Sequence, residues 1–203
     1  MTIRDLFPTL LYQTGLAAGR GWADLAADLR DATTMLAEED AAGRAWCKTN
    51  AYPGYTSYAS LADLPARATA FADLKRLLDR HVAAFAQELH FDLPRRLKLD
   101  SLWVNVLDPK GSHSGHIHPH SAISGTLYLA TPPGSGALKL EDPRLPLMMA
   151  APTLTADAPE ERRRFVYLKP EPGTLYLWES WLRHEVTANA AKQPRISISF
   201  NYA

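Results

Sequence analysis

The 203-residue sequence has little cysteine, no net charge and no long apolar run. Its single cysteine, Cys47, has no partner within the chain, which excludes an internal disulfide and a metal site built from several thiolates. Any metal bound here must therefore rely on nitrogen and oxygen ligands.

The missing net charge follows from 22 Lys and Arg residues that balance 22 Asp and Glu residues. Such a chain has no overall field to gather nucleic acid or an anionic membrane surface, so neither is expected as a partner. No segment approaches the roughly 18 continuous apolar residues of a spanning helix. The first residues, MTIRDLFPTLLYQTG, also lack the basic start and apolar core of a signal peptide, and we expect a cytoplasmic protein.

The length favours one domain over residues 1–203, with a helical part of about 1–93 and a β-rich part of 94–203. Apolar residues at steps of three or four predict a helix over Gly21–Ala42. A stronger stripe predicts a second helix over Pro65–His90, with proline at its start. The segment between them, NAYPGYTSYASL, is typical of an irregular loop that lies across a pocket.

After Pro94 the chain changes to short segments rich in β-branched and aromatic residues, separated by proline and glycine. Because no helices separate these strands, they should pair antiparallel and stack as a two-sheet sandwich or jelly roll, with the helices on one outer face. The polar segment APTLTADAPEERRRF is expected to be a surface loop. The predicted strands are Leu97–Leu107, Ile117–Ala130, Ala137–Glu141, Phe165–Leu168, Thr174–Trp178, His184–Ala188 and Arg195–Tyr202.

Four of the seven histidines lie in the stretch HSGHIHPHS, residues 113–121. On an extended strand alternate residues point to one face, which His116, His118 and His120 would share. Imidazole is a common ligand of iron, zinc, nickel and copper, and two histidines at this spacing can hold one metal. His184, at the start of a later predicted strand, is the obvious third ligand. The sequence therefore predicts a metal site made of His116, His118 and His184.

The other histidines have more ordinary explanations. His81 and His90 fall on the second predicted helix beside charged or amide side chains, and we interpret them as helix residues. His113 lies in a turn rich in glycine and serine and is interpreted as a loop residue. Pro119 disturbs the strand just before His120, which makes His120 a second choice of ligand.

The segment RISISFNY predicts a last strand whose two faces differ. Its Ile, Phe and Tyr residues form an apolar face, while Arg195 and Ser197 lie on the polar face. An arginine that points into a polar space can bind a carboxylate through two parallel hydrogen bonds, and Ser197 can add a third. The hydroxyl of Tyr128 can reach the same anion, although strand tyrosines commonly serve packing. The alternative is a solvated strand face with a surface arginine.

Three stretches, HIHPHSAISGTLYL, LKLEDPR and PGTLYLWESWLRHEV leading into RISISFN, resemble the Fe(II)- and 2-oxoglutarate-dependent oxygenases. The similarity spans roughly residues 97–202 and is greatest to a bacterial and phage subfamily. It implies a double-stranded β-helix, a cupin-like jelly roll. It also implies Fe(II) and 2-oxoglutarate as cofactors, and the oxidation of a small-molecule or peptide substrate, by hydroxylation, with release of succinate and CO2.

The resemblance also implies roles for individual residues. In the family an Arg or Lys about ten residues after the distal histidine binds the far carboxylate of 2-oxoglutarate, and Arg195 lies eleven residues after His184. Ser197 and Tyr128 match residues that assist this arginine in some members. No catalytic residue is implied beyond the metal site.

One position departs from the family pattern, because His118 stands where the family has Asp or Glu. Three neutral imidazoles leave the site one negative charge short, which changes its redox poise and metal preference. Glu141 or Asp142 is a candidate for the missing charge, without support from spacing. Two alternatives therefore stay open: a three-His metal dioxygenase, and a cupin-type metal-binding module, neither of which uses 2-oxoglutarate.

Substrate contacts are expected from Trp103 and Asn105, on the strand before the histidines, and from Trp178, with core packing as the more ordinary role for each. The loop over residues 52–58 and Trp181 are further candidates. These patterns do not name the substrate, and a homodimer is left open.

Overall fold

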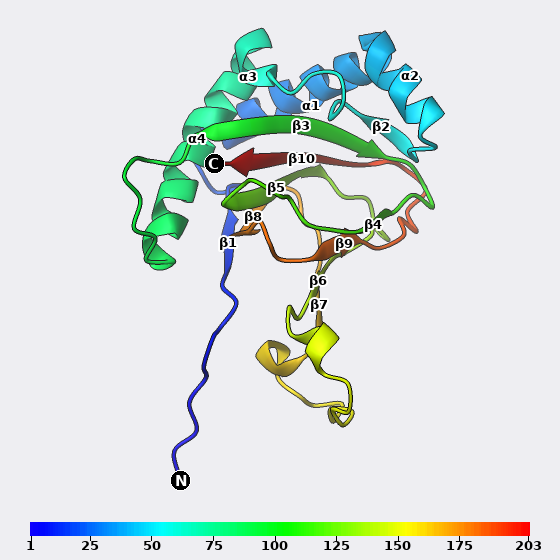
Figure 1. Ribbon diagram of the computed structural model, residues 1–203. Helices are drawn as coiled ribbons and strands as arrows, with labels where there is room; N and C mark the ends of the chain where they lie inside the picture. The colour runs from blue at the N-terminus through cyan, green and yellow to red at the C-terminus, as the bar shows by residue number, and fades with distance from the viewer.

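The computed structural model describes residues 1–203 and contains four α-helices, ten strands and two short 3₁₀ helices (Figure 1). The helices are α1 (Trp22–Glu39), α2 (Ala41–Thr49), α3 (Leu64–Arg67) and α4 (Thr69–Glu88), with η1 (Leu145–Leu147) and η2 (Glu160–Arg162). The strands are β1 (Leu11–Gly15), β2 (Gly54–Thr56), β3 (Leu99–Leu107), β4 (His113–His116), β5 (Ile123–Ala130), β6 (Leu138–Glu141), β7 (Phe165–Leu168), β8 (Thr174–Glu179), β9 (His184–Val186) and β10 (Arg195–Tyr202).

The strands form two antiparallel sheets that face each other. The six-stranded sheet has the order β1-β8-β5-β10-β3-β2, and the four-stranded sheet has the order β4-β9-β6-β7. Strands that are distant in sequence lie side by side in both sheets, as in a jelly roll. The predicted fold class, mainly β with a double-stranded β-helix, is confirmed.

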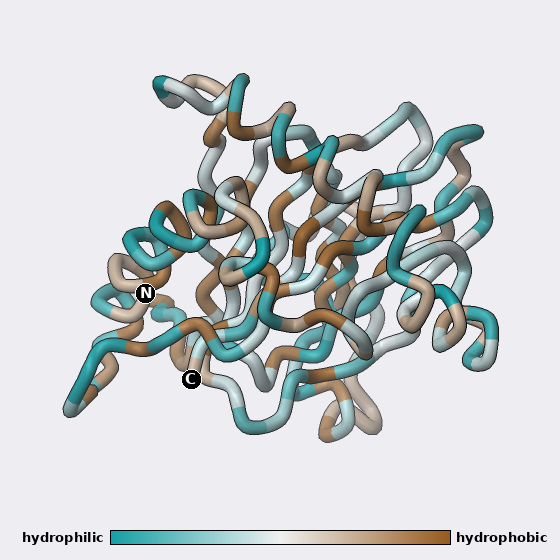
Figure 2. Tube along the Cα trace, turned by 90° about the horizontal axis from the view of Figure 1, so that it is seen from above, coloured by the Kyte–Doolittle hydropathy of each residue, from teal (hydrophilic) through white to brown (hydrophobic).

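The helices cover the outer face of the six-stranded sheet (Figure 1). The apolar stripe of α4 is buried against this face at Phe71, Leu74, Leu78, Val82 and Phe85. These side chains belong to one apolar cluster that also contains residues of β3, β5, β8 and β10. Hydrophobic positions accordingly gather in the centre of the trace (Figure 2). The predicted placement of the helices on one outer face is confirmed.

The inner face of the six-stranded sheet carries polar side chains on β10. On β10 the alternation of side chains places Ile198 and Phe200 in the apolar cluster, while Arg195, Ser197 and Ser199 line a pocket between the two sheets. The two unlike faces predicted for this strand are therefore present. The sandwich therefore has a large apolar core under the helices and, between its sheets, a pocket beside a smaller apolar cluster that includes Leu138, Leu168 and Trp178.

The N-terminal half differs from prediction at the helix boundaries. The first predicted helix ends at Glu39, because Asp40 leaves the helical conformation. Asp40 is the N-cap of α2, since its carboxylate accepts a hydrogen bond from the backbone N–H of Gly43. The second predicted helix is broken at Ala68, whose backbone is extended (φ −145°, ψ 140°). Periodicity detects a buried stripe, but it does not register a one-residue break in the helix. Strands β1 and β2 were not predicted.

The predicted strand over Ile117–Ala130 is also wrong in its first part. β4 ends at His116, residues 117–122 form a loop, and β5 begins at Ile123. Pro119 cannot donate to a ladder, and His120 has a positive φ of 71°, so neither residue suits a continuing strand.

The segment between β6 and β7 projects from the sandwich as a lobe that carries η1 and η2 (Figure 1). It contains the predicted surface loop, and most of its residues are exposed. None of the helices is long and apolar enough to cross a membrane.

Candidate metal centre

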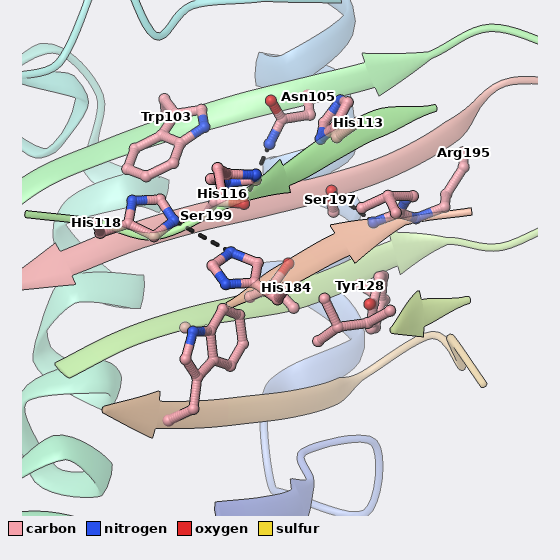
Figure 3. Close-up of a pocket in the computed structure, with 15 residues that line it drawn as sticks. Trp103, Asn105, His113, His116, His118, Tyr128, His184, Arg195, Ser197 and Ser199 are labelled. Atoms are coloured by element: carbon pink, nitrogen blue, oxygen red, sulfur yellow. Dashed lines mark hydrogen bonds between the residues drawn. The ribbon is translucent and has the colours of Figure 1, made fainter. Parts of the chain in front are cut away.

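Three histidine side chains converge between the two sheets (Figure 3). His116 ends β4 and pairs in register with His184, which begins β9. His118 lies two residues beyond the end of β4, in the loop. Each of the three can offer a ring nitrogen such that all three atoms lie within 4.8 Å of one another. The structure thus brings together the three histidines that the sequence singled out.

Backbone carbonyls orient two of these rings. Nδ1 of His116 lies 2.7 Å from the carbonyl oxygen of Ser114, and Nδ1 of His184 lies 2.8 Å from that of Leu182. A carbonyl oxygen only accepts, so both Nδ1 atoms carry the proton and both Nε2 atoms keep a free lone pair. This is the usual arrangement of metal-ligating histidines, whose second nitrogen is fixed by a hydrogen bond.

The contact between His118 and His184 fits a shared cation. Their Nε2 atoms are 3.2 Å apart, and that of His184 has no proton to donate. Two imidazole nitrogens bound at neighbouring positions of one transition metal, each at about 2.1 Å, stand about 3 Å apart. The donor set therefore fits a divalent transition metal.

Burial keeps these rings neutral. It lowers the pKa of His184 to about 3, against a smaller opposing effect of the hydrogen bond with Leu182. Burial and the nearby His116 lower the pKa of His118 to about 4. Because a metal binds the neutral imidazole, these two rings are ready to coordinate at neutral pH without losing a proton.

His118 is held in place although it lies outside a strand. Its backbone N–H donates to the carbonyl oxygen of Ser180, 3.0 Å away. The hydroxyls of Ser180 and Ser124 lie 2.7 Å apart, and that of Ser124 also donates to Oδ1 of Asn201 at 2.8 Å. All three polar side chains are buried. This network attaches the loop that carries His118 to the six-stranded sheet.

Arg195, Ser197 and Tyr128 lie in the same pocket, on the opposite side from His118 and Trp103 (Figure 3). Arg195 is 3% exposed, and its Nε and Nη1 atoms have no hydrogen-bond partner. Its Nη2 lies 3.5 Å from Oγ of Ser197, and its guanidinium lies 5.0 Å from the ring centre of Tyr128. The hydroxyl of Tyr128 is also buried without a partner.

A buried guanidinium without a counter-charge is costly, and buried donors are seldom left unpaired. Both observations are explained if an anion binds here, since a carboxylate can accept from two N–H groups on one edge of the Arg195 guanidinium and from the hydroxyl of Tyr128. The alternative of a surface arginine on a solvated strand is wrong.

The family profile described as "Putative 2OG-Fe(II) oxygenase" matches residues 101–201. The chain belongs to the 2OG-Fe(II) oxygenase superfamily. The resemblance that the sequence motifs indicated is thereby confirmed. No curated protein matches the chain in sequence.

Solved structures show that this oxygenase shares its fold with enzymes of diverse substrates. A prolyl-4-hydroxylase from Pseudomonas putida is 18% identical with a TM-score of 0.61, and the match covers 97% of this chain and 92% of that one. EctD from S. alaskensis, solved with 2-oxoglutarate and 5-hydroxyectoine, is 19% identical with a TM-score of 0.64, over 96% and 72% of the two chains. HygX from Streptomyces hygroscopicus, solved with nickel and 2-oxoglutarate bound, is 15% identical with a TM-score of 0.59, over 97% and 82%.

No carboxylate joins the histidines of this oxygenase. Glu141 pairs with Arg183 at 3.4 Å, and Asp142 pairs with Arg144 at 2.8 Å, so neither supplies the missing charge. His120 lies outside the group, which excludes it as the third ligand. The pocket lining likewise contains no Asp or Glu.

All three expected substrate contacts line the pocket of the oxygenase. The ring of Trp103 lies 5.8 Å from that of His118 and 5.2 Å from that of the exposed Tyr58. Trp178 packs edge-on against His184 at 4.8 Å, and its indole N–H has no partner. Asn105 is buried at the inner wall. Trp181, in contrast, is 46% exposed and is absent from the lining.

One pocket residue of this oxygenase was misassigned from the sequence. His113, interpreted as a loop residue, begins β4 and lines the pocket, and Tyr52 binds its Nε2 at 2.7 Å. The pairing of β4 with β9 is irregular between His113 and His116, a bulge that lets residues three apart both face inward. Burial, followed by the charge of Arg195, lowers the pKa of His113 to about 4. The only sequence signal for this bulge is Gly115.

His81 and His90 are correctly separated from the site. Nδ1 of His81 lies 2.8 Å from the hydroxyl of Tyr12, where α4 packs against β1. His90 follows the end of α4 with a positive φ of 53°.

Proposed function

We propose that this protein is an Fe(II)- and 2-oxoglutarate-dependent dioxygenase that oxidises, by hydroxylation, a C–H bond of its substrate and releases succinate and CO2. One observation carries the proposal: three imidazoles with converging nitrogen atoms lie at one end of the pocket, and a buried guanidinium with unpaired N–H groups lies at the other. Membership of the superfamily supports it, because Fe(II) and 2-oxoglutarate are the cofactors of that superfamily.

In this proposal His116, His118 and His184 hold Fe(II), and Arg195, Ser197 and Tyr128 bind the far carboxylate of 2-oxoglutarate. When bound, iron and 2-oxoglutarate supply the activation of O2 and the oxidation of the C–H bond. The protein supplies neutral ligands, a fixed anchor for the co-substrate and a wall of aromatic rings that limits access of water. No residue beyond the metal site is assigned a catalytic role.

The substrate is proposed to be a small molecule or a peptide, contacted by Trp103, Asn105 and Trp178. The structural neighbours include a prolyl-4-hydroxylase and an enzyme solved with 5-hydroxyectoine, which fits either kind of substrate. The single domain over residues 1–203 is supported by the apolar cluster that helices and sheet share. A cytoplasmic location and a homodimer stay predictions.

The second candidate is a three-His metal dioxygenase, or a cupin-type module, that does not use 2-oxoglutarate. The histidine at the position of the family's carboxylate favours it. This candidate predicts that metal binding and any turnover are indifferent to Arg195→Ala, and that 2-oxoglutarate does not bind.

The deciding experiment measures succinate after anaerobic loading with Fe(II), followed by 2-oxoglutarate and air, with calorimetry of 2-oxoglutarate binding to the Zn²⁺-loaded protein. We expect binding that Arg195→Ala weakens about a hundredfold, because a buried bidentate ion pair is lost. Arg144→Ala, which removes an exposed arginine from the lobe, is the matched control and should bind normally. Absence of 2-oxoglutarate binding in the wild type would refute the proposal.

A further inference from the structure

A residue of the helical half packs behind the lining of the pocket. Tyr52 lies between α2 and β2, and its hydroxyl is 2.7 Å from Nε2 of His113. The two rings are packed with their centres 5.3 Å apart. Arg195 is near enough that its positive charge lowers the pKa of His113, after the larger effect of burial.

The direction of the Tyr52 hydrogen bond decides what His113 offers to the pocket. The hydroxyl has one proton and two neighbours, Nε2 of His113 at 2.7 Å and Oδ1 of Asn105 at 3.3 Å. Oδ1 of Asn105 already accepts from the hydroxyl of Thr56 at 2.9 Å. The hydroxyl donates to only one of these two neighbours. When it donates to Asn105, His113 donates to Tyr52 from Nε2, and when it donates to Nε2, the imidazole proton is carried by Nδ1. A carboxylate held by Arg195 favours the second arrangement, because it accepts from an Nδ1–H and is repelled by an Nδ1 lone pair. Nδ1 makes no hydrogen bond within the protein, although the His113 side chain lines the pocket.

We propose that Tyr52 and His113 form a positioning pair for 2-oxoglutarate, in which Tyr52 fixes the tautomer of His113 and His113 donates its Nδ1–H to the carboxylate held by Arg195. This inference rests on the proposed function and adds to it a residue outside the region that the family profile matches. The side of the pocket around Arg195 then presents hydrogen-bond donors only. This suits a carboxylate and disfavours a neutral ligand of the same shape. The donors come from Arg195, Ser197, Tyr128 and His113.

The pair also gives the helical half a function. Tyr52 is carried by the segment that joins α2 to β2, and β2 pairs with β3 at the edge of the six-stranded sheet. The jelly-roll strands therefore supply the metal ligands and the arginine, while the segment before β2 supplies the residue that orients the last donor.

The test compares calorimetric affinities for 2-oxoglutarate in Zn²⁺-loaded variants, with Zn²⁺ affinity measured separately. An asparagine amide nitrogen can take the place of Nδ1, whereas a glutamine amide reaches the place of Nε2. We expect His113→Asn to bind 2-oxoglutarate within about threefold of the wild type, and His113→Gln and Tyr52→Phe to bind about tenfold or more weakly, because a hydrogen bond to a charged group is lost. Zn²⁺ affinity should be unchanged in all three.

Tyr55→Phe is the matched control. Tyr55 lies in β2, and its hydroxyl donates to Asp40 at 2.8 Å, so the variant loses a hydroxyl from the same region without touching the pocket. It should bind 2-oxoglutarate normally. Equal weakening in Tyr55→Phe would show a general effect of instability and overturn the inference.

A second readout does not depend on affinity. In protein labelled with ¹⁵N-histidine, the complex with Zn²⁺ and 2-oxoglutarate should show His113 protonated on Nδ1. Protonation on Nε2, or wild-type affinity in both His113→Gln and Tyr52→Phe, overturns the inference while the proposed function stands. A wild type that does not bind 2-oxoglutarate overturns both.

Discussion

His118 determines the charge of the proposed metal site. With three neutral imidazoles, a divalent metal keeps both positive charges until an anion arrives, and no carboxylate lies in the pocket lining. The two carboxylates of 2-oxoglutarate would then supply all the negative charge in a pocket that also contains Arg195. Metal and co-substrate should therefore favour each other's binding by the same factor, as linkage requires.

The corresponding prediction concerns His118→Glu, whose carboxylate reaches about as far from the backbone as Nε2 of histidine. A negative charge beside the metal should strengthen Zn²⁺ binding in the absence of 2-oxoglutarate by about tenfold or more, because opposite charges attract strongly in a buried site. The additional gain in Zn²⁺ affinity on adding 2-oxoglutarate should shrink. Competition with a chelator of known affinity measures both quantities.

His120→Glu is the control, because it places the same charge two residues away on a side chain outside the histidine group. It should leave Zn²⁺ affinity within about twofold. If His118→Glu weakens Zn²⁺ binding while His120→Glu does not, the imidazole itself is essential, and the explanation by missing charge is wrong.

At the scale of elements, the local sequence pattern predicted the position of a site residue when that position depends on a single strand. The prediction failed when the position depends on the pairing of two elements. The two faces of β10 follow from its own alternation, so Arg195 and Ser197 were placed correctly on the inner face. The loop position of His118 depends on where β4 stops pairing with β9, and the pocket position of His113 depends on a bulge. Tyr52 lies against His113 because the nearby β2 pairs with β3, some fifty residues later in the chain. Such pairings are decided by the whole fold and leave little trace in a local pattern.

The loop that carries His118 offers a test of how the elements cooperate. Ser124→Ala removes the hydroxyl that joins Ser180 to Asn201, and leaves two buried polar groups without this partner. The unfolding free energy should fall by about 1–3 kcal/mol. Zn²⁺ affinity should fall several-fold as well, because the carbonyl of Ser180 fixes the backbone of His118.

Ser57→Ala serves as the comparison. Ser57 is also fully buried, and its hydroxyl accepts from the backbone N–H of Val104, but it does not line the pocket. It should lose a similar unfolding free energy and keep its Zn²⁺ affinity. Equal losses of affinity in the two serine variants would mean that metal binding simply follows stability.

At the scale of the whole molecule, the proposed ligands would connect the two sheets. His116 and His184 belong to β4 and β9 of the four-stranded sheet, whereas Tyr128 and Arg195 belong to β5 and β10 of the six-stranded sheet. In the proposed site a metal with 2-oxoglutarate would contact both layers, and unfolding either layer would release it. A ligand that binds only the folded state raises stability by about 2.7 kcal/mol at a hundred times its dissociation constant.

Thermal unfolding should show this connection. Ni²⁺ alone should raise the midpoint of the wild type, and Ni²⁺ with 2-oxoglutarate should raise it further, by about 5–10 °C for 2.7 kcal/mol in a chain of this size. Arg195→Ala should keep the rise with Ni²⁺ and lose the further rise, because its metal ligands are intact and its anchor in the six-stranded sheet is gone. A further rise of the same size in Arg195→Ala would place 2-oxoglutarate away from the guanidinium, since the ligand would then stabilise the fold without reaching the second sheet at β10.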